Sequence, residues 1–355
     1  MSPLPTGATV GIIGGGQLGR MLALTAARFG YRVVVLEPDV DCPAAQVANE
    51  HLVAAYDDPD ALATLAERCH VVTYEFENVP LTAARTLTTQ VVLRPGPEAL
   101  RVAQDRLVEK EFLRSIGLGT ASYAPISRAD DVGPVLGAIG RPCIVKTRRL
   151  GYDGKGQLRL DESSRVPTDL YDHLGGVPLI AEGFVDFVCE ISVITARSVG
   201  GEIRSFTPAA NEHRNGILRR SVVPADVSPA TREAAATAGA TLIEALDYVG
   251  VLGLELFVLD DGSILANEFA PRVHNSGHWT ELVCPSDQFE QHIRAVTGHP
   301  LGDPTSAPCE MVNLIGDDLD GWTELVASGD WQVHLYGKGE VRPGRKMGHA
   351  TRLRT

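Results

Sequence analysis

Strand-like and helix-like segments alternate over the first 95 residues, and this alternation limits the fold more than any other feature of the sequence. Buried strands are predicted at 10–13, 32–36, 70–74 and 91–93, and helices at 18–29, 61–68 and 81–87. Because parallel strands need a crossover between them, the pattern predicts βαβ units in a parallel sheet.

The pattern changes after residue 120, where an α+β module is predicted. A helix at 98–116 comes before it, and the expected strands lie at 143–147, 158–160, 179–184 and 190–196, with a helix at 163–173. A long helix at 229–249, a hairpin over 251–269, a helix at 288–297 and short strands from Cys309 onward follow.

Charge and composition exclude several classes of protein. The 355 residues carry 32 Lys and Arg against 45 Asp and Glu, a net charge of −13, so we expect no nucleic-acid or membrane partner. No run of about 18 apolar residues is present, and the N-terminal stretch lacks the basic start of a secretory signal. None of the six cysteines forms a CxxC pair. We therefore expect a cytoplasmic protein.

The C-terminal stretch 338–355 differs from the rest of the chain because it is basic. It holds one acid, Glu340, and the cations Lys338, Arg342, Arg345, Lys346, Arg352 and Arg354. It is interpreted either as a local anion site or as a solvated tail.

A first glycine-rich loop, Gly14 to Gly19, matches GxGxxG between a predicted strand and helix. Glu37 closes the next strand, where a ribose-binding acid lies in dinucleotide folds. Alone, this pattern favours an NAD-dependent oxidoreductase. The same loop also suits another phosphate, or only close packing of the strand and the helix.

A pair of glutamates faces each other across the predicted hairpin. Asp261-Gly262 predicts its turn, and a two-residue or a four-residue loop sets Glu255 opposite Glu268, with Cβ atoms about 5 Å apart. Apolar neighbours suggest burial, where two carboxylates need a proton or a cation between them. Mg²⁺ suits such oxygen ligands, and Asn267 offers another. The alternative is an exposed pair on a solvent face.

A second glycine-rich segment follows a lysine in an apolar strand. Lys146 precedes Arg148, Arg149 and the loop 151–157, which contains three glycines and Lys155. Its backbone N–H groups and positive charge suit a loop that covers a polyphosphate. The alternative is a hairpin tip with a solvated Lys155.

These features together resemble the ATP-grasp superfamily. Within it, 146–149, 151–157, 267–280 and 342–346 resemble the N5-carboxyaminoimidazole ribonucleotide synthetases, the ATPase subunits of phosphoribosylaminoimidazole carboxylase. The resemblance runs from Gly14 almost to the C-terminus. It implies a Rossmann-like pre-ATP-grasp domain (1–105), a two-lobed ATP-grasp domain (106–295, with a mobile lobe at about 120–187) and a small β-rich C-terminal domain (296–355).

The resemblance also implies the site residues. ATP would contact Arg106, Lys146, Gly151, Tyr152, Asp153, Gly154, Lys155, Gly156, Gln157, Glu182, Gly183, Phe184, Val185, Glu190, His213, Asn267 and Glu268. The ribonucleotide would contact Gln17, Leu18, Glu75, Tyr152, Asp153, Arg272, His274, Asn275, Arg342, Arg345 and Lys346. Glu255 and Glu268 would hold Mg²⁺, or Mn²⁺ in its place. His278 and Trp279 are interpreted as packing residues.

The implied reaction is the ATP-dependent carboxylation of 5-aminoimidazole ribonucleotide with bicarbonate, by way of carboxyphosphate. Asp153 and Lys346 would handle protons, and Arg272 would hold a carboxylate or phosphate. A homodimer is expected, with the product passed to a separate mutase. Leu150 departs from the family pattern, where glycine is usual. The alternatives are another ATP-grasp ligase such as a formate-dependent transformylase, an NAD-binding oxidoreductase, or a nucleotide-binding regulatory protein.

Overall fold

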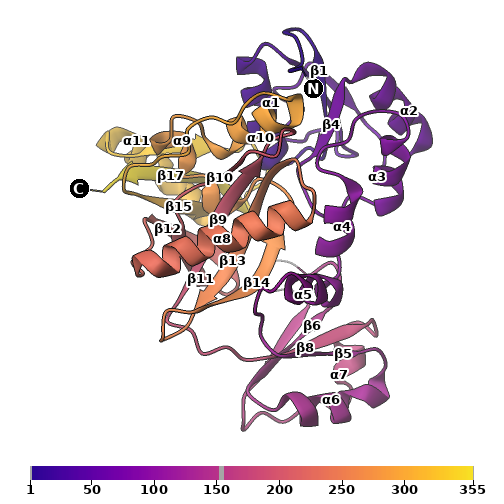
Figure 1. Cartoon of the computed structure of the whole chain (residues 1–355), viewed down its shortest axis with the longest axis vertical. Coiled ribbons are helices and arrows are strands. Elements are labelled where there is room, and N and C mark those ends of the chain that lie inside the picture. The colour runs from indigo at the N-terminus through magenta and orange to yellow at the C-terminus, as the bar shows by residue number, and fades with distance from the viewer. Residues whose placement is uncertain (1, 152–155, 355) are drawn as a thin grey trace.

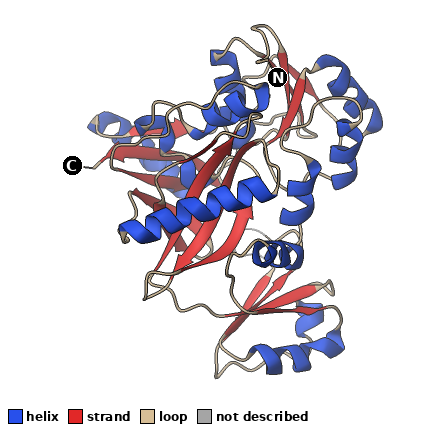
Figure 2. Cartoon of the chain, in the orientation of Figure 1, coloured by secondary structure: helices blue, strands red, loops and turns tan. Residues whose placement is uncertain are grey.

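Three β-sheets form the framework of the chain, whose computed structural model describes residues 2–151 and 156–354. A four-stranded sheet lies near the N-terminus, a second four-stranded sheet lies at the opposite end, and a nine-stranded sheet lies between them (Figures 1 and 2). The first has the order β3-β2-β1-β4 and the second β5-β8-β6-β7. The third has the order β14-β13-β9-β11-β12-β15-β17-β16, with β10 on β9.

The N-terminal sheet is parallel throughout, as the alternation predicts. Its elements are β1 (Thr9–Ile13), α1 (Gln17–Arg28), β2 (Arg32–Leu36), β3 (Glu50–Leu52), α2 (Pro59–Arg68), β4 (Val71–Tyr74) and α3 (Leu81–Thr88). Two details were wrong. The segment 91–93 makes only a single bridge, Val72 to Leu93, and β3 was missed because its three residues, Glu-His-Leu, carry almost no apolar pattern.

The single helix predicted at 98–116 is two helices, α4 (Pro97–Ala103) and α5 (Arg106–Ser115). Asp105 separates them with an extended backbone (φ −136°, ψ 113°), and its carboxylate accepts a hydrogen bond from the Leu107 N–H. An N-cap of this kind starts a new helix, so the chain turns here. Arg148 holds the same carboxylate through two hydrogen bonds of 3.0 and 2.8 Å.

The second sheet is antiparallel and carries β5 (Tyr123–Ile126), β6 (Cys143–Thr147), β7 (Gln157–Leu160) and β8 (Leu179–Gly183), with α6 (Val132–Ile139) and α7 (Leu170–His173) beside it. The helix predicted at 163–173 was wrong except for its last turn, α7. Pro167 lies inside that segment, and a proline disfavours helical backbone at the residue before it.

The large sheet collects the rest of the chain. Its strands are β9 (Cys189–Arg197), β10 (Ile203–Ser205), β11 (Ala209–Arg214), β12 (Ile217–Val223), β13 (Gly250–Val258), β14 (Ile264–Ala270), β15 (Cys309–Ile315), β16 (Gln332–Leu335) and β17 (Lys346–Leu353). The helices around it are α8 (Pro229–Ala245), α9 (Thr280–Val283), α10 (Gln288–Thr297) and α11 (Trp322–Ser328). Because β15 pairs with β12, the C-terminal strands extend this sheet. The boundary predicted after residue 295 falls within α10, and the domain limits remain predictions.

The hairpin of β13 and β14 pairs Glu255 with Glu268, as predicted, but its loop length and its register near the turn differ from the prediction. Leu259 and Ser263 close a three-residue loop in which Gly262 has a φ of 81°, so both predicted loop lengths were wrong. Near the turn the register is therefore shifted by one residue, and Leu256 faces Ala266. A bulge at Asn267 absorbs the difference and brings the two glutamates opposite each other.

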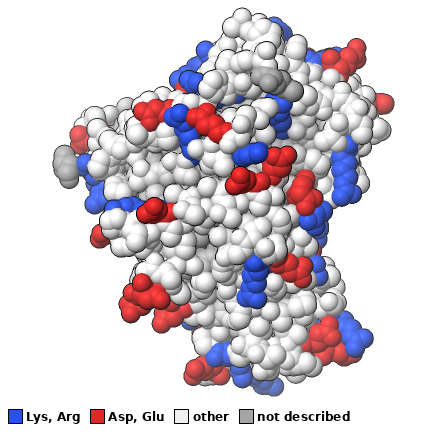
Figure 3. Space-filling model, in the orientation of Figure 1, with Lys and Arg blue, Asp and Glu red and all other residues white. Residues whose placement is uncertain are grey.

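Charged side chains on the face shown in Figure 3 are of both signs and surround a broad uncharged area over α8. No described helix is long and apolar enough to cross a membrane.

The buried histidine His292 of α10 joins the N-terminal sheet to the large sheet. Its Nδ1 accepts a hydrogen bond from the Val251 N–H at 3.1 Å, and its Nε2 lies 2.7 Å from the Thr73 hydroxyl. Burial lowers the pKa of His292 to about 3. The folded chain therefore keeps this ring neutral at pH values where an unfolded chain protonates it.

We expect acid to destabilise the protein through this histidine. As the pH falls from about 6.5 towards 3, the unfolded state alone gains the proton, so the free energy of unfolding falls by up to about 1.4 kcal/mol per pH unit. Urea unfolding between pH 7 and pH 5 measures this slope. His292→Asn should reduce the slope by about one proton, and an unchanged slope would contradict the assignment.

Candidate active site

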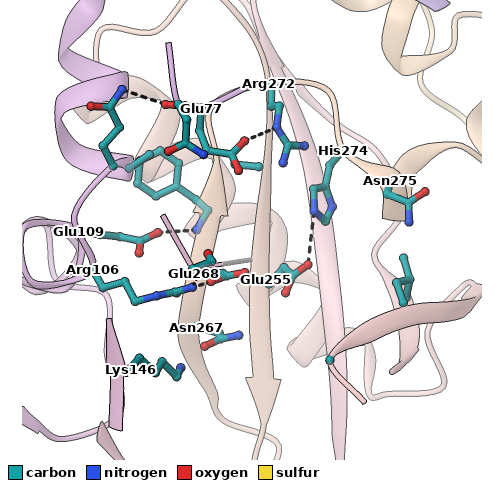
Figure 4. A pocket seen from close by; sticks show the side chains of 18 of the residues that line it. Glu77, Arg106, Glu109, Lys146, Glu255, Asn267, Glu268, Arg272, His274 and Asn275 are labelled. Atoms are coloured by element: carbon teal, nitrogen blue, oxygen red, sulfur yellow. Dashed lines mark hydrogen bonds and ion pairs between the residues drawn. The ribbon is translucent and has the colours of Figure 1, made fainter. Parts of the chain in front are cut away.

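A cavity of about 450 Å³ opens between the second sheet and the large sheet (Figure 4). Lys146 and Gln157 come from β6 and β7 on one side, and Glu255 and Glu268 from β13 and β14 on the other. Helix α5 supplies Arg106. Figure 4 places Lys146 near one end of the drawn pocket, Arg272 near the other end, and the two glutamates between them.

Most of the predicted site residues meet in this cavity. Those that line it are Gln17, Leu18, Arg106, Lys146, Gly151, Gln157, Glu190, His213, Glu255, Asn267, Glu268, Arg272, His274, Asn275 and Lys346. The ATP and ribonucleotide residues predicted far apart in the sequence thus share one space.

Other predicted residues do not line this cavity. They are Glu75, Gly156, Glu182, Gly183, Phe184, Val185, Arg342 and Arg345. Arg342 is exposed and pairs with Glu340, whose carbonyl oxygen accepts from Arg345 at 2.8 Å. Of the predicted C-terminal phosphate cluster, only Lys346 reaches the cavity. Tyr152, Asp153, Gly154 and Lys155 lie outside the described residues.

The glutamate pair has unequal surroundings. Arg106 donates to Glu268 at 2.6 Å and holds the pKa of that carboxyl low, although enclosure alone would raise it. Glu255 lies 3.5 Å from the His274 Nε2, and burial together with the charge of Glu268 raises its pKa. Glu255 therefore needs a proton or a nearby cation. This carboxylate pair, with Asn267 on the adjacent bulge, fits a hard divalent cation such as Mg²⁺.

Two lysines share one buried carboxylate beside the cavity. The ammonium groups of Lys110 and Lys146 each lie 3.2 Å from the same oxygen of Glu182. Burial would raise the pKa of Glu182, but the two lysines outweigh it and lower it. Burial lowers the pKa of Lys146, and Glu182 opposes that shift. Glu182 thus acts from behind Lys146 and fixes its position.

Two more acids hold the strand and loop that form the cavity wall. Glu109 accepts a hydrogen bond from the Phe269 N–H at 2.7 Å, and burial raises its pKa to about 8. Glu77 accepts from Arg272 at 2.6 Å. Both pairs appear in Figure 4. They fix Arg272 and the backbone next to Glu268 before any ligand arrives.

A histidine on β11 pairs with an acid on β9. His213 contacts Glu190, and although burial lowers the pKa of this histidine, the glutamate raises it above its usual range. Both line the cavity.

The first glycine-rich loop is filled by the chain's own carboxylates. Glu75 accepts hydrogen bonds from the N–H groups of Gly16 at 2.8 Å and Gly19 at 3.0 Å, and Glu37 accepts from Gly15 at 2.8 Å. These are the donors that would cradle a pyrophosphate in a dinucleotide fold. The chain itself therefore fills the anion site that the NAD interpretation needs, while Gln17 and Leu18 of the same loop line the cavity.

Replacing Glu75 by Gln is expected to destabilise the protein by about 1–3 kcal/mol, because an amide nitrogen cannot accept from the loop. Urea unfolding measures the change, and Glu67→Gln on exposed α2 surface is the matched control. Equal stability of the two variants would contradict this role of Glu75.

Leu150 has a φ of 62°, in the left-handed region that glycine occupies easily. The departure from the family pattern therefore affects the backbone. A leucine there raises the local energy by about 1 kcal/mol or more.

Sequence reasoning missed Glu77, Glu109, Lys110 and the link from Asp105 to Arg148. A helical pattern could have found two of them. Residues 106, 109, 110 and 113 share one face of α5, and three of these four are charged although the face is buried against the sheet. Glu77 had no signal beyond its place just after a parallel strand.

A cleft between two antiparallel sheets, with a lysine on one and paired glutamates on the other, defines an ATP-grasp enzyme, a class of ATP-dependent ligases. A model of the ATP-grasp domain matches residues 111–289. A ribonucleotide synthetase preATP-grasp domain matches 7–104, and a phosphoribosylaminoimidazole carboxylase C-terminal domain matches 309–355.

Relatives of known identity narrow the class. An N5-carboxyaminoimidazole ribonucleotide synthase of Brucella melitensis is 54% identical over 355 residues, covering 99% of this chain and 98% of the relative. The ADP complex of an N5-carboxyaminoimidazole ribonucleotide synthetase has a TM-score of 0.96 at 40% identity, covering 99% and 94%. The Aspergillus clavatus synthase with ADP and 5-aminoimidazole ribonucleotide has a TM-score of 0.89 at 31% identity, covering 98% and 94%.

The chain belongs to the N5-carboxyaminoimidazole ribonucleotide synthase family. The resemblance stated from the sequence, the ATP-grasp fold class and the ligase class are thereby confirmed.

Proposed function

We propose that this chain uses ATP and bicarbonate to carboxylate the exocyclic amine of 5-aminoimidazole ribonucleotide, with ADP and phosphate as the other products. One observation carries the proposal. A single cavity joins Lys146 and the glutamate pair to Arg272, His274 and Lys346, which gives a nucleotide end and a substrate end in one space.

At the nucleotide end, the cations offset the charge of a triphosphate. Lys146 and Arg106 supply positive charge, and Glu190 would take the ribose hydroxyls. Glu255 and Glu268 would hold Mg²⁺ with Asn267 beside the phosphates. The bound ion would supply further positive charge near the transferred phosphoryl group.

At the substrate end, Arg272 and Lys346 supply positive charge for a ribonucleotide phosphate or a carboxylate. Arg272 is held by Glu77, and Lys346 lies on β17. Burial and the nearby Arg272 lower the pKa of His274 to about 3, so its neutral ring can exchange hydrogen bonds with the substrate.

The proposed reaction has three steps and consumes only ATP, bicarbonate and the ribonucleotide. A bicarbonate oxygen attacks the γ-phosphorus of ATP and ADP leaves, which gives carboxyphosphate. Carboxyphosphate breaks into CO₂ and phosphate inside the cavity. The amine nitrogen then bonds to CO₂ and loses a proton, with Lys346 as the nearby proton-handling group.

Further parts of the proposal have support only from the family. They are the homodimer, the cytoplasmic location, the separate mutase that takes the product, and the roles of Tyr152, Asp153, Lys155, Arg342 and Arg345.

The test is ADP release with Mg²⁺, ATP and bicarbonate, with and without 5-aminoimidazole ribonucleotide. Strong stimulation by the ribonucleotide and bicarbonate supports the proposal. Stimulation by formate with a ribonucleotide would favour a transformylase. Binding of NADH, seen by nicotinamide fluorescence, would reopen the oxidoreductase interpretation that Glu75 argues against.

A further inference from the structure

Three metal-ligand side chains from three separate elements meet away from the cavity, next to the C-terminal hairpin. They are Glu281 of α9, His334 of β16 and His349 of β17, and one ligand atom from each lies within 4.8 Å of the others. The Glu281 Oε2 is 3.2 Å from the His334 Nδ1 and 3.2 Å from the His349 Nε2.

These contacts do not have the geometry of hydrogen bonds. The Glu281 Oε2 is buried and has no hydrogen-bond partner, although two imidazole nitrogens lie near it. Bonds of about 2.0–2.1 Å in a tetrahedral zinc site separate neighbouring ligand atoms by about 3.3 Å. Both carboxylate-to-imidazole distances agree with that spacing.

The surroundings fix the ring of His349 in the way a ligand needs. Its Nδ1 lies 3.0 Å from the Tyr336 hydroxyl, which leaves Nε2 facing Glu281. Metal-bound histidines usually have such a partner on the other nitrogen. The His349 side chain is 3% exposed, so packing holds its ring in this orientation.

We propose that Glu281, His334 and His349 bind one divalent transition-metal ion of the zinc class, with water as the fourth ligand. Imidazole with a carboxylate suits this class, whereas the all-oxygen pair Glu255 and Glu268 suits Mg²⁺. The side chains of Glu281 and His334 are 22% and 24% exposed, so the three residues lie close to the protein surface.

Such an ion would lie outside the cavity and would hold together elements that carry cavity-lining residues. Helix α9 follows the 272–275 segment that lines the cavity, and β17 begins with Lys346. An ion shared by α9, β16 and β17 ties those two parts of the substrate end together. The binding itself does not depend on the proposed reaction.

The experiment titrates Zn²⁺ and Co²⁺ into the chelator-treated full chain in excess Mg²⁺, which occupies carboxylate sites. The wild type is expected to bind one equivalent and to show the visible absorption of tetrahedral Co²⁺. His334→Ala should weaken binding at least about a hundredfold, and Tyr336→Phe by about 10–100-fold, since it removes only the partner of His349. His173→Ala, which removes an exposed histidine of α7, should bind as the wild type does.

Circular dichroism checks that each variant is folded, and Glu281→Gln replaces any variant that is not. No binding by the wild type would overturn the proposal. Equal affinity in the wild type and a folded His334→Ala or Glu281→Gln variant would overturn it as well.

Discussion

Glu268→Ala is expected to reduce ADP formation on the order of a thousandfold. The substitution removes one of the two facing carboxylates and leaves Arg106, whose side chain is 19% exposed, without its 2.6 Å partner. The cavity then gains net positive charge, and its metal-binding pair becomes a single carboxylate. Steady-state ADP release with saturating ATP, bicarbonate and ribonucleotide measures the loss.

The control is Glu98→Ala, which also breaks a glutamate–arginine pair, but an exposed one with Arg101 on α4. That variant is expected to keep wild-type turnover, because exposed ion pairs contribute at most about 1 kcal/mol. Wild-type ADP formation by a folded Glu268→Ala protein would refute the metal assignment.

Lys346→Ala is expected to reduce ribonucleotide-stimulated turnover by about a hundredfold or more, in the range found for proton-transfer groups. Nucleotide binding should stay within a few-fold of wild type, because Lys146 and Arg106, the cations assigned to the triphosphate, remain in place. The backbone should hold, since the main-chain oxygen at 346 still accepts from Lys338 at 2.7 Å. ADP affinity and ribonucleotide-dependent turnover, measured separately, test this split.

Arg354→Ala is the matched control, since it removes an exposed cation from the same basic stretch. It should leave both quantities unchanged. Loss of ADP binding in Lys346→Ala would place the lysine at the nucleotide end and contradict the assigned role.

For the glutamate pair, local sequence predicted the pairing of the two residues but not the length of the loop between their strands. Alternating apolar residues and a turn signal were enough to place Glu255 opposite Glu268. They were not enough for the loop length, because a three-residue loop and a bulge at Asn267 compensate each other. The error in loop length and the missed bulge are each one residue, so their effects on the pairing cancelled. Only hydrogen bonding across the folded hairpin decides such a register.

For the basic C-terminal stretch, the charge pattern did not predict which cations line the cavity. Its charge indicated an anion site, yet within the described residues Lys346 alone of that stretch lines the cavity, while Arg342 and Arg345 turn to Glu340. Charge along a chain says how many cations are near one another in sequence. The side on which each one emerges depends on the strand and turn that carry it.

By itself the sequence determined the parallel N-terminal sheet, most of the later strands and the residue types of an ATP-grasp site, since these follow from local periodicity and short motifs. Tertiary structure decided the partner of each enclosed charge: the loop N–H groups for Glu75, Lys110 and Lys146 for Glu182, and Arg106 for Glu268. The partners lie 36 to 162 residues apart. No local pattern links residues at such separations, because only the packed sheets bring them within hydrogen-bond distance.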